Sequence, residues 1–147
     1  IDLVKEIGSR LGRPVEIVNI PFNGLFSAVQ SGRIDIALSS ITVTEKRLGS
    51  VAFAQPYYDS AHSLTVTTRS SANSLADMRG KIIERIETGE RYAMMFGKGK
   101  PLADEVDAVI TTLKEEGFVA ELHERWFGTV PAETSSTVTV VEKPTSR

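Results

Sequence analysis

A short strand that runs directly into a helix is the most constraining feature of this chain. Apolar residues alternate at Ile34, Ile36 and Leu38, as they do in a half-buried β-strand. Two serines and a threonine follow, and Thr44 is then a good N-cap for a helix that carries Arg47. Strands that alternate with helices build α/β proteins, so the run predicts a layered α/β fold.

The loop between this strand and this helix has the chemistry of a carboxylate-binding site. Backbone N–H groups at a helix N-terminus lack intrahelical partners and favour anions. The hydroxyls of Ser39, Ser40 and Thr42 add donors, and Arg47 can grip a carboxylate with two parallel bonds. Nothing in the run would break a covalent bond, so the run predicts binding. The alternative is an ordinary serine-rich loop followed by a solvated arginine.

Helical and extended patterns alternate along the rest of the chain. The predicted helices cover residues 1–11, 23–31, a short stretch from 44, 101–117 and from there to about 126. The predicted extended segments cover residues 15–20, 34–38, 51–54, 63–68 and 91–96. Residues 128–147 are rich in Thr, Ser, Glu and Pro and are expected to be a linker or disordered tail, although 137–141 has strand propensity.

Composition narrows the possible functions. A chain of 147 residues is expected to form one domain, and its net charge of -2 argues against a nucleic-acid partner. There are no cysteines, which excludes thiolate metal sites and cysteine nucleophiles. His62 and His123 are the only histidines, and neither has a partner at motif spacing. No metal, cofactor or catalytic residue is therefore expected.

Several segments together resemble the polar amino-acid-binding proteins of ABC importers, which are type II periplasmic solute-binding proteins. Ser40, Thr42 and Arg47 fill the places of the motif in that family's first lobe. Further similar segments are Ile1-Asp2-Leu3-Val4-Lys5-Glu6-Ile7, Phe22-Asn23-Gly24-Leu25, Phe53-Ala54-Gln55-Pro56-Tyr57-Tyr58, Leu75-Ala76-Asp77-Met78-Arg79-Gly80-Lys81 and Tyr92 through Phe127, which closes in Glu124-Arg125-Trp126-Phe127.

The resemblance implies that residues 1–127 form the first ligand-binding lobe. Its fold would have three layers, with helices on both faces of a mostly parallel sheet. Two departures matter. The second lobe has no counterpart in this sequence, and a join or omission falls near residues 81–82. The family's first strand also has no counterpart before Ile1, so its central slot would be filled by preceding residues, by 137–141 or by a neighbouring copy.

The resemblance also assigns roles to individual residues. Arg47 and the N–H groups near Thr42 would hold the α-carboxylate of an amino acid. The Thr42 hydroxyl and the main chain of Ser40 would complete the contacts, with Ser39 beside them, and Phe22 would stack over the ligand. The acidic partner for the α-ammonium comes largely from the second lobe in this family. Weak or undetectable binding by this chain alone is therefore expected.

The expected function is delivery of an amino acid to an ABC permease, in the periplasm or outside the cell, with a lipid anchor as a further option in the parent protein. A homodimer through the exposed cleft face, lined by Phe22, is a further expectation. Two alternatives stay open: a cyclohexadienyl or arogenate dehydratase-like enzyme on the same fold, and a sensor or interaction module.

Overall fold

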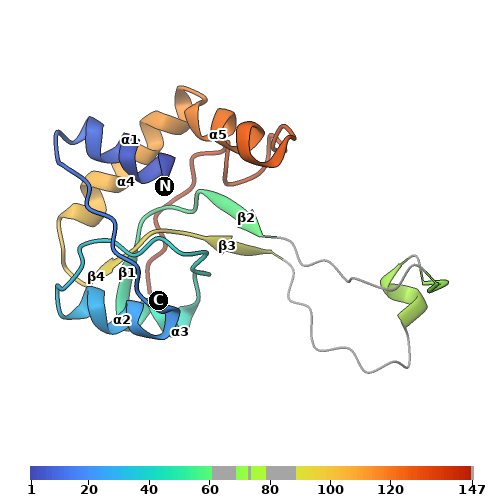
Figure 1. Ribbon diagram of the computed structural model, residues 1–147, viewed down its shortest axis with the longest axis horizontal. Coiled ribbons are helices and arrows are strands. Elements are labelled where there is room, and N and C mark those ends of the chain that lie inside the picture. Colours follow the sequence, from blue (N-terminus) through green and yellow to red (C-terminus); the bar gives the residue numbers. More distant parts are fainter. Residues whose placement is uncertain (61–68, 73, 79–88, 147) are drawn as a thin grey trace.

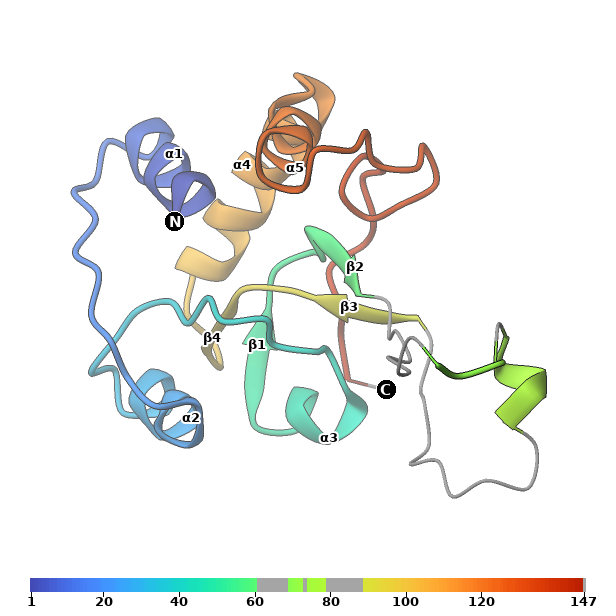
Figure 2. The same ribbon diagram turned by 45° about the vertical axis from the view of Figure 1, so that its right-hand side comes forward.

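Helices flank a small set of strands on both sides in the computed structural model of the chain (Figures 1 and 2). The structure describes residues 1–60, 69–72, 74–78 and 89–146, so the strand predicted over 63–68 and the join near 81–82 lie outside the described residues. The predicted helices are confirmed, with ends that differ by one or two residues. The helical elements are α1 (Asp2–Arg10), α2 (Phe22–Gln30), α3 (Glu45–Leu48), the 3₁₀ turn η1 (Leu75–Met78), α4 (Leu102–Glu115) and α5 (Phe118–Phe127).

The strands of the described residues form two antiparallel pairs, β1 with β4 and β2 with β3. Their bounds are β1 (Val51–Phe53), β2 (Tyr58–Ser60), β3 (Glu90–Tyr92) and β4 (Met95–Gly97). Two isolated bridges, Ala37 with Met95 and Thr42 with Tyr92, are antiparallel as well. The α/β class with helices on both faces is confirmed, but parallel pairing is absent from the ladders in this part of the chain. The reason is that the run 90–97 returns past the earlier segments in the opposite direction.

Two predicted strands differ from the structure. Residues 15–20 and 34–38 are neither helical nor part of a named strand, and only Ala37 makes a bridge. Their alternating patterns suit strands, but a strand also needs a neighbour that supplies hydrogen bonds along its length. The predicted strand over 91–96 is present as the two separate strands β3 and β4.

The run from Ala93 to Phe96 divides the apolar interior into two cores. Met94 and Phe96 lie in the core beneath α1, α4 and α5. Ala93 and Met95 lie in the core beneath α2 and α3. Successive residues of extended backbone point to opposite sides, so this run joins both layers of helices. Among the helices of the described ranges, none has the length and apolarity needed to cross a lipid bilayer.

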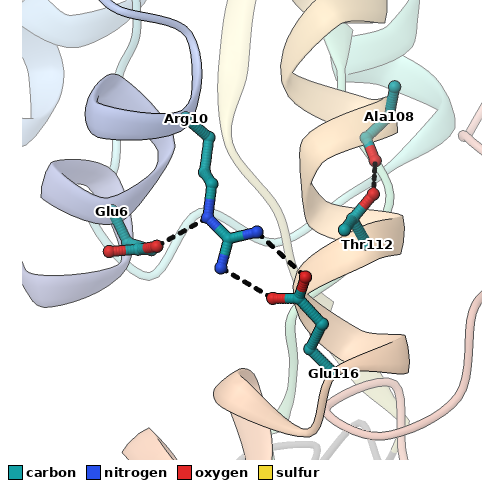
Figure 3. Close-up of polar contacts among 5 residues, drawn as sticks. All are labelled: Glu6, Arg10, Ala108, Thr112 and Glu116. Carbon is teal, nitrogen blue, oxygen red and sulfur yellow. Dashed lines mark hydrogen bonds and ion pairs between the residues drawn. The ribbon is translucent and has the colours of Figure 1, made fainter.

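Arg10 connects α1 to the C-terminal end of α4 (Figure 3). Its Nε donates to Glu6 at 2.8 Å, and its Nη1 and Nη2 donate to the two carboxylate oxygens of Glu116 at 3.0 and 2.6 Å. Hydrogen bonding to Arg10 lowers the pKa of the Glu116 carboxyl. The groups are exposed, so this fork orients the two helices more than it stabilises them.

The C-terminal segment, residues 128–146, follows a defined path against the rest of the chain. The backbone N–H and the hydroxyl of Ser136 donate to the carboxylate of Asp59 at 2.9 and 2.6 Å. The Thr139 carbonyl accepts from the ammonium of Lys114 at 3.0 Å. A solvated linker would lack such contacts. Here Asp59 and Lys114, which are distant in sequence, hold the C-terminal segment in place through hydrogen bonds. The division of the chain after residue 127 stays a prediction.

Lys114 is a buried cation on α4. Besides Thr139, its ammonium donates to the side chain of Gln55 at 2.9 Å and to the carbonyl of Pro56 at 2.7 Å. Burial lowers the pKa of Lys114 to about 8, although the carboxylates of Asp107 and Asp59 act in the opposite direction. All three of its acceptors are neutral, so the charge is solvated by dipoles rather than paired in direct contact.

Candidate ligand-binding site

The short helix α3 places Arg47, as the sequence predicts. The Thr44 side chain accepts from the backbone N–H of Arg47 at 3.3 Å, which confirms Thr44 as the N-cap. The helix has only four residues, so its dipole is far smaller than that of a longer helix. The anion-binding capacity of this region therefore depends on Arg47 itself more than on the helix terminus.

The side chain of Arg47 points back towards the preceding loop. Its Nη1 donates to the carbonyl of Thr42 at 2.6 Å, and the side chain is partly buried. Its Cζ lies 5.9 Å from the ring centre of Phe22 and 5.4 Å from that of Phe26, within the range of cation–π attraction. In the described part of the chain, Nε and Nη2 of Arg47 have no hydrogen-bond partner. Those two nitrogens remain available to an anion.

Thr42 is held beside Arg47 by β3. The N–H of Val43 donates to the carbonyl of Arg91, and the N–H of Ala93 donates to the carbonyl of Ile41. These bonds leave the N–H of Thr42 facing away from β3, without a partner among the described residues. The Thr42 hydroxyl donates to Oε2 of Glu90 at 3.0 Å. Because a hydroxyl has a single proton, Thr42 can offer a ligand only an acceptor there while its N–H serves as the donor.

The five predicted site residues divide into two groups. Phe22, Thr42 and Arg47 are brought together by the contacts above. Ser39 and Ser40 are exposed and line a groove of about 1070 Å³ whose lining does not include the other three. Ser40 has a φ of 47°, a left-handed conformation that turns the chain between the groove and Thr42. No described contact joins either serine to Arg47.

Sequence reasoning missed two residues at this site, Phe26 and Glu90. Phe26 lies one helical turn after Phe22, with ring centres 6.2 Å apart in an edge-to-face arrangement. The i, i+4 spacing of the two phenylalanines is a signal that could have identified it. Glu90 reaches Thr42 only through the pairing of β3 with residues 42–43, and no local pattern in the sequence reveals that pairing.

The chain belongs to the bacterial extracellular solute-binding proteins, family 3, whose family model matches residues 1–129. It is 25% identical over 130 residues to the arginine-binding extracellular protein ArtP of Bacillus subtilis. The aligned region covers 84% of this chain and 51% of ArtP. It is 36% identical over 83 residues to the probable histidine-binding protein of Campylobacter jejuni. This aligned region covers 56% of this chain and 32% of that protein. The chain thus spans about half of the length of ArtP and about a third of that of the Campylobacter jejuni protein.

Solved structures agree with the fold. ArtJ of Geobacillus stearothermophilus, an arginine-, lysine- and histidine-binding protein, matches with a TM-score of 0.72 over 90% of this chain and 86% of that one, at 20% identity. The arginine-bound form of domain 1 from TmArgBP matches with a TM-score of 0.54 over 76% of this chain and 71% of that one, at 30% identity. The first match shows the fold alone.

Proposed function

We propose that this chain is an amino-acid-binding lobe of a solute-binding protein that supplies an ABC importer. The observation that carries the proposal is the conformation of the Arg47 side chain. Its guanidinium is fixed by Thr42, Phe22 and Phe26 and still has two nitrogens free among the described residues. A guanidinium held in this way beside the open N–H of Thr42 suits the α-carboxylate of an amino acid.

A cationic amino acid is the ligand that the relatives favour. ArtP is named for arginine, and the Campylobacter jejuni relative is named for histidine. Both ligands carry an α-carboxylate and an α-ammonium. The carboxylate would bind Arg47 and the N–H of Thr42, whereas the ammonium would donate to the Thr42 hydroxyl on the side of Glu90. The choice among cationic side chains depends on groups beyond these contacts.

Partners and location are also proposals for the full-length protein. Relatives of this family are extracellular solute-binding proteins, and we place the full-length protein outside the cytoplasm with an ABC permease as its partner. A lipid anchor stays a prediction. So does a homodimer through the cleft face, where Phe22 is 43% exposed. The named relatives are binding proteins, and nothing in the described site favours the dehydratase or sensor alternatives.

Calorimetry with Arg47 variants tests the proposal. The whole chain is expected to bind L-arginine or L-histidine with a measurable heat. Arg47→Lys keeps the charge but loses the planar fork, so the affinity is expected to fall about tenfold. Arg125→Lys, on the exposed surface of α5, is the matched control and should bind as the unmodified chain does. Equal affinities for the chain and for Arg47→Lys would contradict the proposal.

A further inference from the structure

The C-terminal segment is hydrogen-bonded to the middle residue of β2, Asp59. Figure 2 shows the segment leaving α5 and passing the β2–β3 pair. The backbone N–H and the hydroxyl of Ser136 donate to the two carboxylate oxygens of Asp59, at 2.9 and 2.6 Å. Ser136 is only 1% exposed, and hydrogen bonds to a carboxylate are stronger than those between neutral groups. Two strong bonds therefore tie β2 to the C-terminal segment.

A second group of contacts holds the same segment a few residues further along the chain. The Thr139 carbonyl accepts from Lys114 of α4 at 3.0 Å, and the N–H of Val141 donates to the side-chain oxygen of Gln55 at 3.3 Å. The amide nitrogen of Gln55 donates in turn to the hydroxyl of Thr111 on α4 at 2.7 Å. The C-terminal segment is thus attached to α4 as well as to β2, and it connects the two.

The strands that this attachment supports are short. β2 and β3 have three residues each and pair in an antiparallel register that places Asp59 opposite Arg91. A two-stranded pair of this length is marginally stable by itself. Within the pair, Tyr58 stacks on Tyr92 with ring centres 5.8 Å apart, and Nε of Arg91 lies 3.5 Å from the Asp59 carboxylate. The bonds from Ser136 add support from outside the pair.

β3 lies between β2 and the residues of the candidate site. On the edge away from β2, two backbone hydrogen bonds of 3.0 and 3.2 Å join β3 and the residue after it to residues 41–43. These bonds place Thr42 beside β3, where its hydroxyl donates to Glu90 at 3.0 Å. The position of Glu90 at the site therefore depends on β3, and β2 supports β3 on its other edge.

We infer that Ser136 is a positioning residue for ligand recognition. It acts through Asp59 and the β2–β3 pair to keep Glu90 beside Thr42. The inference rests on the proposed function, in which the ammonium of an amino acid binds on the side of Glu90. The bonds of Ser136 increase the fraction of molecules in which β3 is paired on both edges, and Glu90 can meet the ammonium only in that state.

Hydrogen exchange of the whole chain tests the structural step without a ligand. Ser136→Ala removes the hydroxyl donor to Asp59. The N–H groups of Val43 and Ala93, which report the pairing of β3 with the site, should then exchange about tenfold faster. Ser135→Ala is the matched control, because the buried hydroxyl of Ser135 has no hydrogen-bond partner in the part of the chain that the structure describes. Unchanged exchange in Ser136→Ala, or an equal increase in α2, would overturn the inference.

Calorimetry tests the step from position to recognition. Ser136→Ala should lower the affinity for L-arginine about fivefold, and the affinity for the arginine analogue that lacks the α-amino group should change little. Adding Ser136→Ala to Glu90→Gln should cause no further loss, since both substitutions remove the same contribution. Equal losses for the two ligands, or additive losses in the double variant, would overturn the inference. If the unmodified chain binds neither ligand, the proposed function fails, and the exchange measurement alone decides whether Ser136 positions β3.

Discussion

Arg47 is already held in position before a ligand arrives. Its guanidinium is fixed by the carbonyl of Thr42 and flanked by the rings of Phe22 and Phe26. An arginine that is free in solution loses side-chain entropy when it binds an anion, and these contacts have removed much of that loss in advance. Because Nη1 donates to the carbonyl of Thr42, an anion can bind the guanidinium through Nε and Nη2.

Glu90 is expected to favour ligands that have an α-amino group. Its carboxylate accepts from the Thr42 hydroxyl, so an ammonium that reaches this hydroxyl also approaches a negative charge. Glu90→Gln is expected to lower the affinity for L-arginine about tenfold. The affinity for the arginine analogue that lacks the α-amino group should change little between the unmodified chain and Glu90→Gln. Calorimetry with both ligands checks this, and an equal loss for the two would contradict the assigned role.

Lys114 makes the stability of the chain depend on pH in the alkaline range. Its pKa is about 8 in the folded chain, against 10.5 for an ordinary lysine. Between these values the unfolded chain binds more protons, so the free energy of unfolding rises as pH increases from about 8 towards 10.5. The gain amounts to at most about 3 kcal/mol. Burial raises the pKa of Tyr57 to about 12, which has the opposite effect above pH 10.

Lys114→Met isolates this contribution. The variant has no titrating group on that side chain, so its stability should lack the rise between pH 8 and 10 that the unmodified chain shows. Urea unfolding at several pH values gives the free energy of unfolding of both proteins. Tyr57 is present in both, so its titration does not contribute to the difference between them. At pH 7 the variant also leaves the carbonyls of Pro56 and Thr139 without their donor and removes one of the two donors to the side-chain oxygen of Gln55, which opposes any gain from removing a buried charge. Parallel pH profiles would contradict the burial argument.

At the scale of elements, the short helix α3 connects local sequence to the site. Four residues cannot form a stable helix alone, so α3 depends on its cap and on Leu48, which packs in the core beneath α2 and α3. The cap bond goes to the backbone N–H of Arg47 itself. A weaker cap would therefore loosen the residue that the proposed ligand contacts.

Thr44→Ala is expected to affect stability and binding together. Loss of the cap should lower the free energy of unfolding by about 1 kcal/mol, which corresponds to a fall in Tm of about 2–4 °C. Binding of L-arginine should weaken as well. Thr44→Ser keeps a hydroxyl acceptor and is the control. Scanning calorimetry measures the effect on stability, and titration calorimetry measures the effect on binding. A serine variant as impaired as the alanine variant would show that the methyl group of Thr44, and not the cap, is what matters.

The elements also show how far sequence carries a prediction. Helices α1, α2, α4 and α5 were predictable because their apolar period and their ends are local properties of the chain. The segments 15–20 and 34–38 have strand patterns, yet a ladder depends on a partner that local sequence does not specify. The same difference separates Arg47 and its cap, which were predictable, from Glu90, which reaches the site through β3.

At the scale of the molecule, the candidate site is one-sided. The described contacts supply a guanidinium, a free N–H and a hydroxyl beside a carboxylate, all from a single lobe. Two charge-assisted contacts are worth about 1.5–3 kcal/mol each, so a net binding free energy of about 4 kcal/mol is reasonable. That corresponds to a Kd on the order of 1 mM.

Thermal unfolding with added ligand tests this weak affinity in the whole chain. At a Kd of about 1 mM, 10 mM L-arginine should stabilise the fold by about 1.4 kcal/mol and raise Tm by about 3–5 °C. Arginine methyl ester, which lacks the free carboxylate, controls for ionic strength and solvent effects and should give a smaller shift. Calorimetric binding in the micromolar range would contradict the one-sided site, because such affinity requires contacts beyond those that Arg47 and Thr42 supply.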